Sequence, residues 1–316
     1  MDKKTRLLVE ALQKKRSAEG LSIRALSKII GVSFSSLARI ERGDGDPDNN
    51  SKLRILEWLG DDARESGLSF ENVAFVHFRA SKNVSSKTTH CLLQAADLLK
   101  REYIHQHPNL MGSSSEDSSP ADISISLSKP EMEALADAFR KDLGVKENDS
   151  LDALNISIEG VDVYVPEQVP NISRDCLQYL KGKGKDEWSA MSVPLDRDNH
   201  AWAILRNNTH TIERQRVTFL EECWHIMLGH KLTKIAKIAD AYGRTYDSDE
   251  EHDAFFLASA TMLPEKAITR SVEKQVSAEE TAKKFGASPE LVEYRIKRLG
   301  LWRQYTGRKV TLAEVN

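Results

Sequence analysis

Hydrophobic positions at three- and four-residue spacing predict a bundle of short helices in the first sixty residues. The expected helices cover residues 6–16, 23–30, 34–40 and 51–59. Only the turn Gly31-Val32-Ser33 separates the two middle helices, and Ser22 and Ser33 are placed to cap them. Two short helices joined by a glycine turn are typical of a helix-turn-helix, so the chain is expected to begin with an all-α bundle.

The middle of the chain reads as a connector. Residues 72–79 (NVAFVHFR) alternate as a short strand does, and residues 88–104 have the apolar spacing of an amphipathic helix. That helix could supply a dimer interface, or it could pack back on its own chain. Residues 112–119 (GSSSEDSS) have the composition of a flexible linker and mark the clearest domain boundary.

From residue 128 the order of helices, strands and a long helix predicts an α+β domain. A capping box at 128–131 opens a helix that ends near Gly144. The later elements are expected at 151–154 (helix), 161–165, 187–193 and 201–205 (strands), 196–199 (turn) and 212–232 (long helix). We therefore expect a multidomain chain, divided into a helical bundle (1–70), a connector (71–127), the α+β domain (128–265) and a C-terminal helical subdomain (266–316).

Composition and charge refine this division. The 316 residues carry a formal net charge of -3, yet residues 1–42 hold ten Lys or Arg against four acids, which favours DNA over a merely solvated basic face. No apolar run approaches a membrane span or a secretory signal. The three cysteines, Cys91, Cys176 and Cys223, lie far apart and outside any C-x-x-C motif. They favour a reducing cytoplasm and argue against a disulfide framework.

The long helix carries the most informative polar residues, in the stretch TFLEECWHIMLGH from Thr218 to His230. On a helical wheel Leu220, Trp224, Met227 and Leu228 are expected on the core side, and Thr218, Glu221, Glu222, His225 and Gly229 share a separate arc. That arc is either the solvated face of an amphipathic helix or a site. Glu221 and His225, one turn apart, can point at one atom, with Glu222 beside them as a general base.

The segment LSIRALSKIIGVSFSSLARIERG (residues 21–43) resembles the XRE, or lambda repressor-like, family of helix-turn-helix proteins. The resemblance implies DNA binding, often as a homodimer. By their position in the motif, the residues that would face the major groove are Ser33, Phe34, Ser35, Ser36 and Arg39. Ile23 and Phe34 stand where the family often has glutamine. Phe34 could touch a thymine methyl group or pack against a neighbouring residue.

Three later blocks resemble the ImmA/IrrE family of zinc metallopeptidases: RQRVTFLEECWHIMLGH, DAFFLASATMLP and AKKFGASPELVEYRIKRLGL. Together with the helix after residue 128, the resemblance covers roughly residues 129–302 and implies a zincin-like domain. It implies that Glu222 is the general base, that His225 and Asp253 are metal ligands, and that Glu221 replaces the first histidine ligand. The family's chemistry would be peptide hydrolysis with zinc and water.

Glu221 alters the expected metal site. A shell of Glu221, His225 and Asp253 is formally neutral with a divalent cation, so it weakens the cation as a Lewis acid and moves preference from Zn²⁺ towards Mn²⁺ or another divalent cation. An empty site would leave carboxylates to repel one another unless a proton or a cation intervened. The run DSDEEHD (residues 247–253) offers Glu250 and His252 as reserve ligands, although its acids also suit a helix N-terminus.

Two functions compete on this evidence. The first is a cytoplasmic DNA-binding transcription regulator whose ImmA/IrrE-like domain is a sensor or effector. The second is an active metal-dependent endopeptidase that cleaves a partner repressor or an antitoxin-like protein. The C-terminal helical pair, capped by Ser277 and Ser288 around Gly286, resembles a second helix-turn-helix, but in the ImmA/IrrE family this segment belongs to the peptidase fold.

Overall fold

The computed structural model describes residues 3–47, 49–59, 85–108, 127–196, 200–230, 234–238, 241–246 and 248–309. The expected strand at 72–79 and the expected linker at 112–119 lie outside these residues. The chain divides into two units. The first contains residues 1–102, 169–188 and 232–246, and the second contains 103–168, 189–231 and 247–316. Among the described helices, none combines the length and the apolar character that a membrane span requires.

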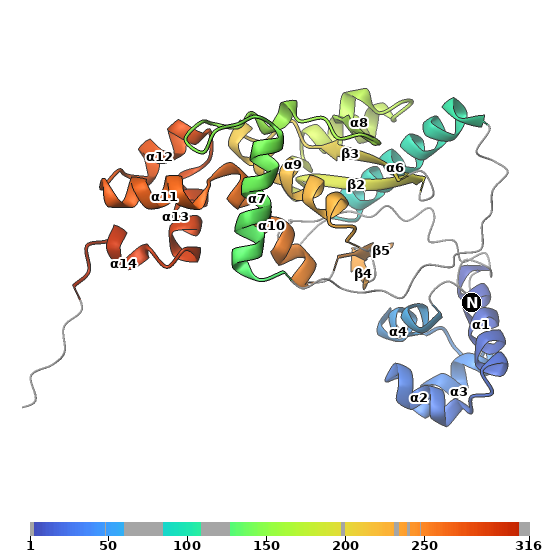
Figure 1. The fold of residues 1–316 in the computed structure, drawn as a ribbon. Coiled ribbons are helices and arrows are strands. Elements are labelled where there is room, and N and C mark those ends of the chain that lie inside the picture. The colour runs from blue at the N-terminus through green and yellow to red at the C-terminus, as the bar shows by residue number, and fades with distance from the viewer. Residues whose placement is uncertain are drawn as a thin grey trace, which may run out of the picture. The chain divides into compact units, whose positions relative to one another are not determined.

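The first unit begins with the expected helical bundle, drawn in blue in Figure 1. Its helices are α1 (Lys3–Ala18), α2 (Ile23–Ile30), α3 (Phe34–Arg42) and α4 (Asn49–Leu59). They enclose a small apolar core that includes Leu12, Leu26, Leu37, Ile40, Ile55 and Leu59. The bundle follows the predicted hydrophobic spacing, because each helix buries one stripe of aliphatic side chains against the others.

The remainder of the first unit contains most of α6 (Ser86–Gln106), together with α8 (Arg174–Lys181), a 3₁₀ turn η5 (Lys185–Glu187) and the antiparallel pair β4 (Lys234–Ile238) and β5 (Ala241–Thr245). The helix expected at 88–104 is thus slightly longer. Cys91 on α6 and Cys176 on α8 form a disulfide. This corrects the expectation of free thiols, because sequence spacing does not reveal that the fold brings two helices together at these positions.

The second unit is built around a three-stranded sheet in the order β1-β3-β2. The strands are β1 (Val161–Tyr164), β2 (Ala190–Asp196) and β3 (Ala201–Arg206). β1 runs parallel to β3, with Val161 opposite Trp202, and β2 runs antiparallel to it, with Ala190 opposite Arg206. The sheet confirms the predicted strand positions, although β2 begins three residues later than the expected start at Glu187.

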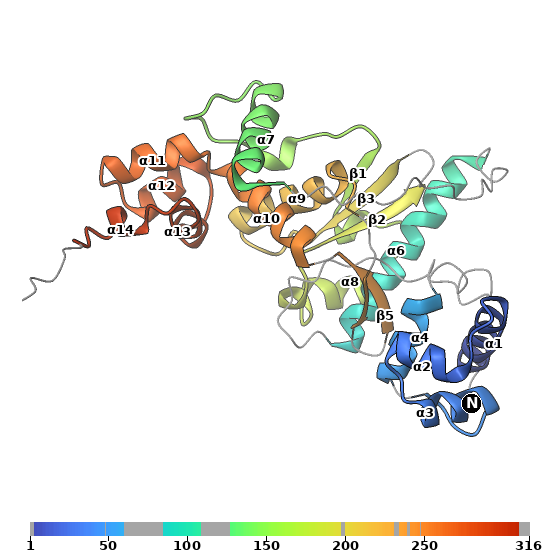
Figure 2. The ribbon, with the colours of Figure 1, turned by 60° about the horizontal axis from the view of Figure 1, so that its bottom comes forward.

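Helices complete the second unit, as Figures 1 and 2 show. They are α7 (Lys129–Asp142), η3 (Ala153–Asn155), η4 (Pro166–Gln168), α9 (Ile212–Met227), α10 (Ser248–Met262), α11 (Glu265–Glu273), α12 (Ala278–Phe285), α13 (Pro289–Arg298) and α14 (Trp302–Tyr305). Residues of α7, α9, α10 and the C-terminal helices share one large apolar core. The unit is therefore α+β.

The long helix α9 is shorter than expected. It ends at Met227 instead of Leu232, because Gly229 adopts the left-handed conformation (φ 65°) that terminates helices. Leu220 and Trp224 are buried as predicted, but Met227 is 36% exposed. The prediction for Met227 was wrong because the residue lies in the last turn, where the helix leaves the core.

Candidate functional site

The turn between α2 and α3 has the capping geometry of a helix-turn-helix. The Ser22 hydroxyl accepts a hydrogen bond from the Ala25 amide (3.1 Å), and the Ser33 hydroxyl accepts one from the Ser36 amide (3.2 Å). Gly31, between the helices, has a φ of 65°, which a residue without Cβ adopts at little cost. These local interactions fix the angle at which α3 leaves the turn.

An ion pair attaches α3 to α1. The Arg16 guanidinium donates from Nε to Glu41 Oε1 (2.6 Å) and from Nη2 to Oε2 (2.8 Å), and it also donates to the Leu21 carbonyl (2.8 Å). The hydrogen bond with Glu41 raises the pKa of Arg16. A two-point contact of this kind fixes orientation as well as distance. The ion pair therefore fixes the orientation of α3 relative to α1, and with it the side of α3 that faces solvent.

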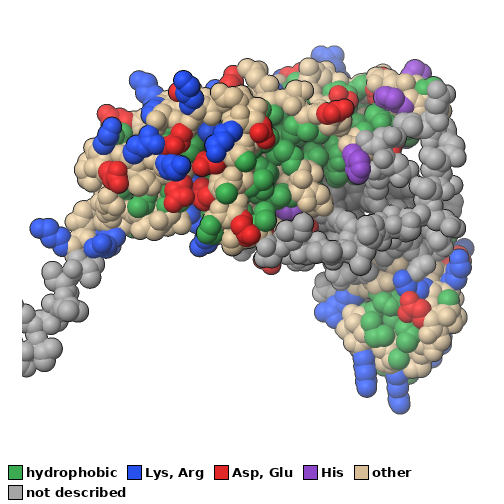
Figure 3. All heavy atoms as spheres, in the orientation of Figure 1, with side chains coloured by type: hydrophobic (Ala, Val, Ile, Leu, Met, Phe, Trp, Pro, Cys, Tyr) green, Lys and Arg blue, Asp and Glu red, His purple; other side chains and the backbone are tan. Residues whose placement is uncertain are grey.

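Four of the five residues predicted to face DNA are exposed, namely Ser33, Phe34, Ser35 and Arg39, and Ser36 is half-buried. Phe34 is 46% exposed, and the Arg24 guanidinium lies over its ring at 5.3 Å. Phe34 is thus not a core residue, although a neighbouring cation shields one face of its ring. Lysine and arginine side chains project from the visible side of this bundle in Figure 3.

The polar arc of α9 is buried. Thr218, Glu221, Glu222 and His225 are each 0–2% exposed. The alternative of a solvated helix face is therefore wrong for these four residues. Ser192 on β2 donates a hydrogen bond to the Glu222 carboxylate. Burying two adjacent carboxylates costs free energy unless polar partners surround them, so the fold supports a polar site at this position.

His225 lies between His230 and a carboxylate of α10. Its Nδ1 is 2.9 Å from Nδ1 of His230, and the two rings meet edge to face. Its Nε2 is 4.0 Å from Oε2 of Glu251. The family resemblance had pointed to Asp253 as the α10 carboxylate, and neither His230 nor Glu251 was among the expected ligands.

Asp253 lies near two histidines, His252 and His230. Burial raises its pKa, while the nearby His252 and His230 lower it. Burial also lowers the pKa of His230, against the opposing effect of Glu250, Asp253 and Glu251. Asp253 thus belongs to the acidic group around His230. Of the two reserve candidates, Glu250 joins this group, whereas His252 contacts Arg298 of α13.

Sequence reasoning missed Ser192 and the placement of Glu251. Ser192 sits in an apolar strand, with no pattern that connects it to α9. Glu251 was visible only as one acid in the first turn of α10, where it also suits the helix dipole. Helix geometry, with a rise of 1.5 Å and a turn of 100° per residue, places Glu251 and Asp253 on different sides of α10. It does not show which of the two faces His225.

The placed side chains do not complete a zinc shell. Imidazole nitrogen and carboxylate oxygen are ligand types that zinc accepts, and bond lengths of 2.0–2.2 Å put two tetrahedral ligand atoms about 3.4 Å apart. His225 Nε2 and Glu251 Oε2 are wider apart, at 4.0 Å. Within the described ranges, no group of three or more His, Cys, Asp or Glu side chains is arranged to hold a metal ion.

The C-terminal helices carry both acidic and basic side chains. α12 and α13 are capped by Ser277 and Ser288 and joined at Gly286, as predicted. The first half of α13 carries Glu290 and Glu293, and its last turn carries Arg295, Lys297 and Arg298. Acidic and basic side chains alternate over this region in Figure 3.

Comparison with protein families agrees with both parts of this description. Residues 12–50 match the family model described as helix-turn-helix, and residues 187–297 match the model described as the IrrE N-terminal-like domain. The chain thus joins an XRE-type helix-turn-helix domain to an ImmA/IrrE-like peptidase-family domain. Neither the comparison with curated proteins nor the comparison with solved structures gave a match.

Proposed function

We propose that this protein is a cytoplasmic DNA-binding transcription regulator whose ImmA/IrrE-like domain acts as its sensor or effector. The observation that carries the proposal is the pairing of the two domains in one chain. The exposed side of α3 supports DNA binding, because a serine-rich helix start followed by Arg39 suits contacts with phosphates and base edges. A homodimer on a two-fold operator would be the expected partner arrangement.

The DNA-binding part is tested by fluorescence anisotropy with a duplex from the protein's own promoter region. We expect Arg39→Ala to weaken specific binding about 5- to 150-fold, because a side chain that contacts a base contributes about 1–3 kcal/mol. Lys283→Ala/Lys284→Ala removes two exposed charges from α12 and serves as the matched control, with unchanged affinity. Equal affinity for promoter and random duplexes at about 0.15 M salt would contradict the proposal.

We further propose that the peptidase-like site is altered at Glu221, with Glu222, His225 and Asp253 in the remaining family positions. The buried arc on α9 supports a retained polar site, while the carboxylate at position 221 removes one of the neutral imidazoles that zinc favours. Glu221→His is then expected to raise zinc content towards about one ion per chain, measured by elemental analysis after purification without chelator.

A metal-dependent endopeptidase that cleaves a repressor-like partner is the second candidate. The burial of Glu222 beside His225 favours it, because a carboxylate sheltered from bulk water can serve as a general base. In that case the unmodified protein would already contain about one equivalent of metal, whether Zn²⁺ or Mn²⁺. Glu222→Gln would then abolish cleavage of the partner. A metal-free natural protein that gains zinc only in Glu221→His would exclude this candidate.

A further inference from the structure

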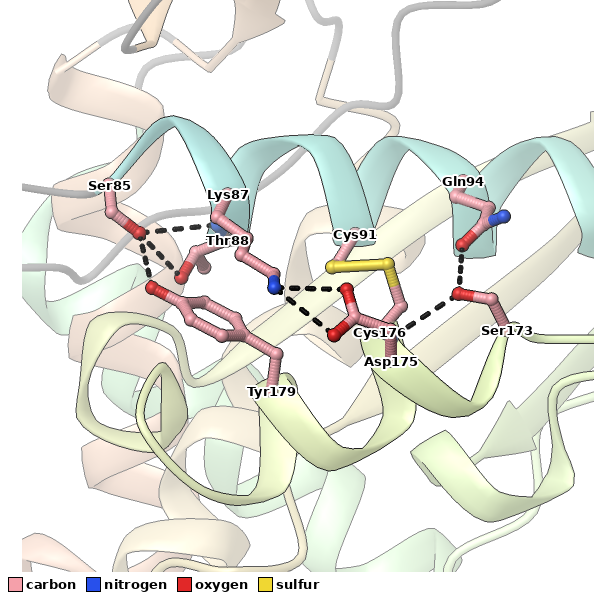
Figure 4. The surroundings of a disulfide bond; sticks show 9 residues. All are labelled: Ser85, Lys87, Thr88, Cys91, Gln94, Ser173, Asp175, Cys176 and Tyr179. Atoms are coloured by element: carbon pink, nitrogen blue, oxygen red, sulfur yellow. Dashed lines mark hydrogen bonds and ion pairs between the residues drawn. A yellow bond between two sulfur atoms is a disulfide. The ribbon is translucent and has the colours of Figure 1, made fainter.

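α6 and α8 are joined along one face by contacts in matched, reversed order (Figure 4). Near one end the Ser85 hydroxyl lies 2.9 Å from the Tyr179 hydroxyl. In the middle Cys91 is bonded to Cys176. At the other end the Ser173 hydroxyl donates to Oε1 of Gln94 (3.1 Å). As the contact positions rise from 85 to 91 and 94, their partners fall from 179 to 176 and 173, so the helices run antiparallel in one shared register.

Polar contacts hold this register independently of the disulfide. Glu187 accepts hydrogen bonds from the Ser85 amide (2.8 Å), the Ser85 hydroxyl (2.7 Å) and the Thr88 hydroxyl (2.6 Å). Lys87 forms an ion pair with Asp175 (2.9 Å) and lies over the Tyr179 ring at 4.8 Å. These groups would keep the two sulfur atoms close when the bond is reduced, so that it can form again.

The third cysteine does not compete for this bond. Cys223 is buried in α9 as part of the large apolar core of the second unit, whereas Cys91 and Cys176 belong to the first unit. Exchange with either of them would require that tightly packed core to open. Oxidation is therefore confined to one pair, and a second, scrambled pairing is disfavoured.

We propose that Cys91 and Cys176 are a reversible redox-sensing pair that locks α6 to α8 when the cell meets an oxidant. Disulfides in proteins of reducing compartments are usually transient or redox-sensing rather than permanent. The compartment is part of the proposed regulator function, but the thiol chemistry does not depend on DNA binding. Cys91 and Cys176 are themselves buried, at 0% and 3% exposed, and beside them the Lys87–Asp175 ion pair lies at the surface, with side chains 47% and 75% exposed (Figure 4).

The oxidant is a hydroperoxide and the reductant a dithiol. One thiolate attacks a peroxide oxygen, the O–O bond breaks, and hydroxide leaves, giving a sulfenic acid. The other thiolate then attacks that sulfur, so the S–S bond forms and a second hydroxide leaves; with hydrogen peroxide, two thiols yield one disulfide and two waters. For reduction, one thiolate of the dithiol attacks the disulfide and forms a mixed disulfide, and its second thiol then displaces the cysteine. The dithiol gives up two electrons and becomes a disulfide, and Cys91 and Cys176 are thiols again.

Thiol counting and peptide mapping of the full chain test the bond itself. After hydrogen peroxide, a thiol reagent in denaturant is expected to find one thiol per chain, and after dithiothreitol three, since the chain has three cysteines. A non-reducing tryptic digest of the oxidised protein should contain peptide 88–100 linked to peptide 175–181. Cys223→Ala should keep this linked peptide. Three free thiols after oxidation would overturn the proposal.

Reversibility and the mechanical effect are measured on the same samples. Dithiothreitol under native conditions is expected to release the linked peptide, lower the melting temperature by roughly 5–15 °C and speed amide exchange in α6 about tenfold or more. Cys176→Ser, with Cys91→Ala as a second variant, should show the reduced behaviour with or without peroxide. A bond that resists native reduction, or an α6 exchange rate indifferent to its state, would contradict a switch.

Discussion

Two buried arginines tie the second unit together through different partners. Arg140 of α7 donates to three backbone carbonyls, those of Thr261 (2.8 Å), Lys146 (2.7 Å) and Asp149 (2.7 Å). Burial lowers its pKa. Arg295 of α13 instead makes a two-point ion pair with a carboxylate of α7, Glu133, at 2.8 Å for each contact, and also donates to the Leu263 carbonyl (3.1 Å).

The Arg295–Glu133 pair gives a test at the residue scale. Glu133→Gln would leave a fully buried guanidinium without its countercharge, so we expect the free energy of unfolding to fall by about 2–4 kcal/mol in urea titration. Glu293→Gln removes the partner of an exposed ion pair with Lys297 on the same helix and should lower it by less than about 0.5 kcal/mol. Similar losses in both variants would contradict the importance of burial.

Sequence reasoning succeeded for individual residues whose roles are local. The capping serines Ser22, Ser33, Ser277 and Ser288 were all predicted, because a cap depends on neighbours three residues away. Ser192, Glu251 and the Cys91–Cys176 pair were not. Ser192 lies 30 residues from its partner Glu222, Glu251 lies 26 residues from His225, and the two cysteines are 85 residues apart. No periodicity of the sequence encodes such distant contacts.

At the scale of elements, the two helix-turn-helix-like turns use the same device. The Gly31 carbonyl accepts a hydrogen bond from Arg54 of α4, and the Gly286 carbonyl accepts one from Arg216 of α9 (3.1 Å). Both glycines have a φ of 65°. An arginine from a third helix thus closes each turn, in addition to the cap that the sequence revealed.

Gly31→Ala tests how the backbone conformation of the glycine and the hydrogen bond from Arg54 contribute to the first turn. A new Cβ would lie 2.5 Å from Nη1 of Arg54, so the variant suffers backbone strain and also displaces the arginine. We expect a loss of about 2 kcal/mol in the stability of the bundle, measured by thermal unfolding. Gly20→Ala has the same backbone strain with no atom near its Cβ and should lose only about 1 kcal/mol.

The start of α6 provides a pH-dependent prediction. Burial raises the pKa of Glu187, but the hydrogen bonds from Thr88 and Ser85 outweigh it, so the net pKa lies below the ordinary value of about 4.3. A carboxylate with a lowered folded pKa stabilises the protein fully above its unfolded pKa, and this contribution is lost as pH falls through the folded value.

We therefore expect Glu187→Gln to lose about 1 kcal/mol of stability at pH 7, since the carboxylate is only half-buried. The difference between the variant and the natural protein should shrink as the pH falls from about 5 to about 3. Chemical denaturation at several pH values measures it. A difference that grows towards acid pH would show that the hydrogen bonds do not favour the charged carboxylate.

At the scale of the whole molecule, the sequence predicted the order of parts: a helical bundle, then an α+β domain with a capped C-terminal pair. The end of α9 and the β4–β5 pair were not predicted. Gly229 could have marked that end, because glycine commonly follows a helix terminus. The amphipathic spacing of α6 left open whether it forms a dimer or packs on its own chain; the structure shows one such intrachain contact, with α8, and the homodimer stays a prediction.

The position of α7 has a consequence for how the chain can be divided. The family match begins at residue 187, yet two residues of α7 bind to the matched region: Arg140 donates to the Thr261 carbonyl, and Glu133 forms an ion pair with Arg295. β1 also pairs with one edge of β3. A chain starting at residue 187 would expose that edge as a template for intermolecular pairing and would aggregate. One starting at residue 85 keeps α6 with α8 as well as α7 and β1, and should give a monodisperse, cooperatively unfolding fragment, as size-exclusion chromatography and calorimetry would show. The smallest autonomous folding unit is thus larger than the region that identifies the family.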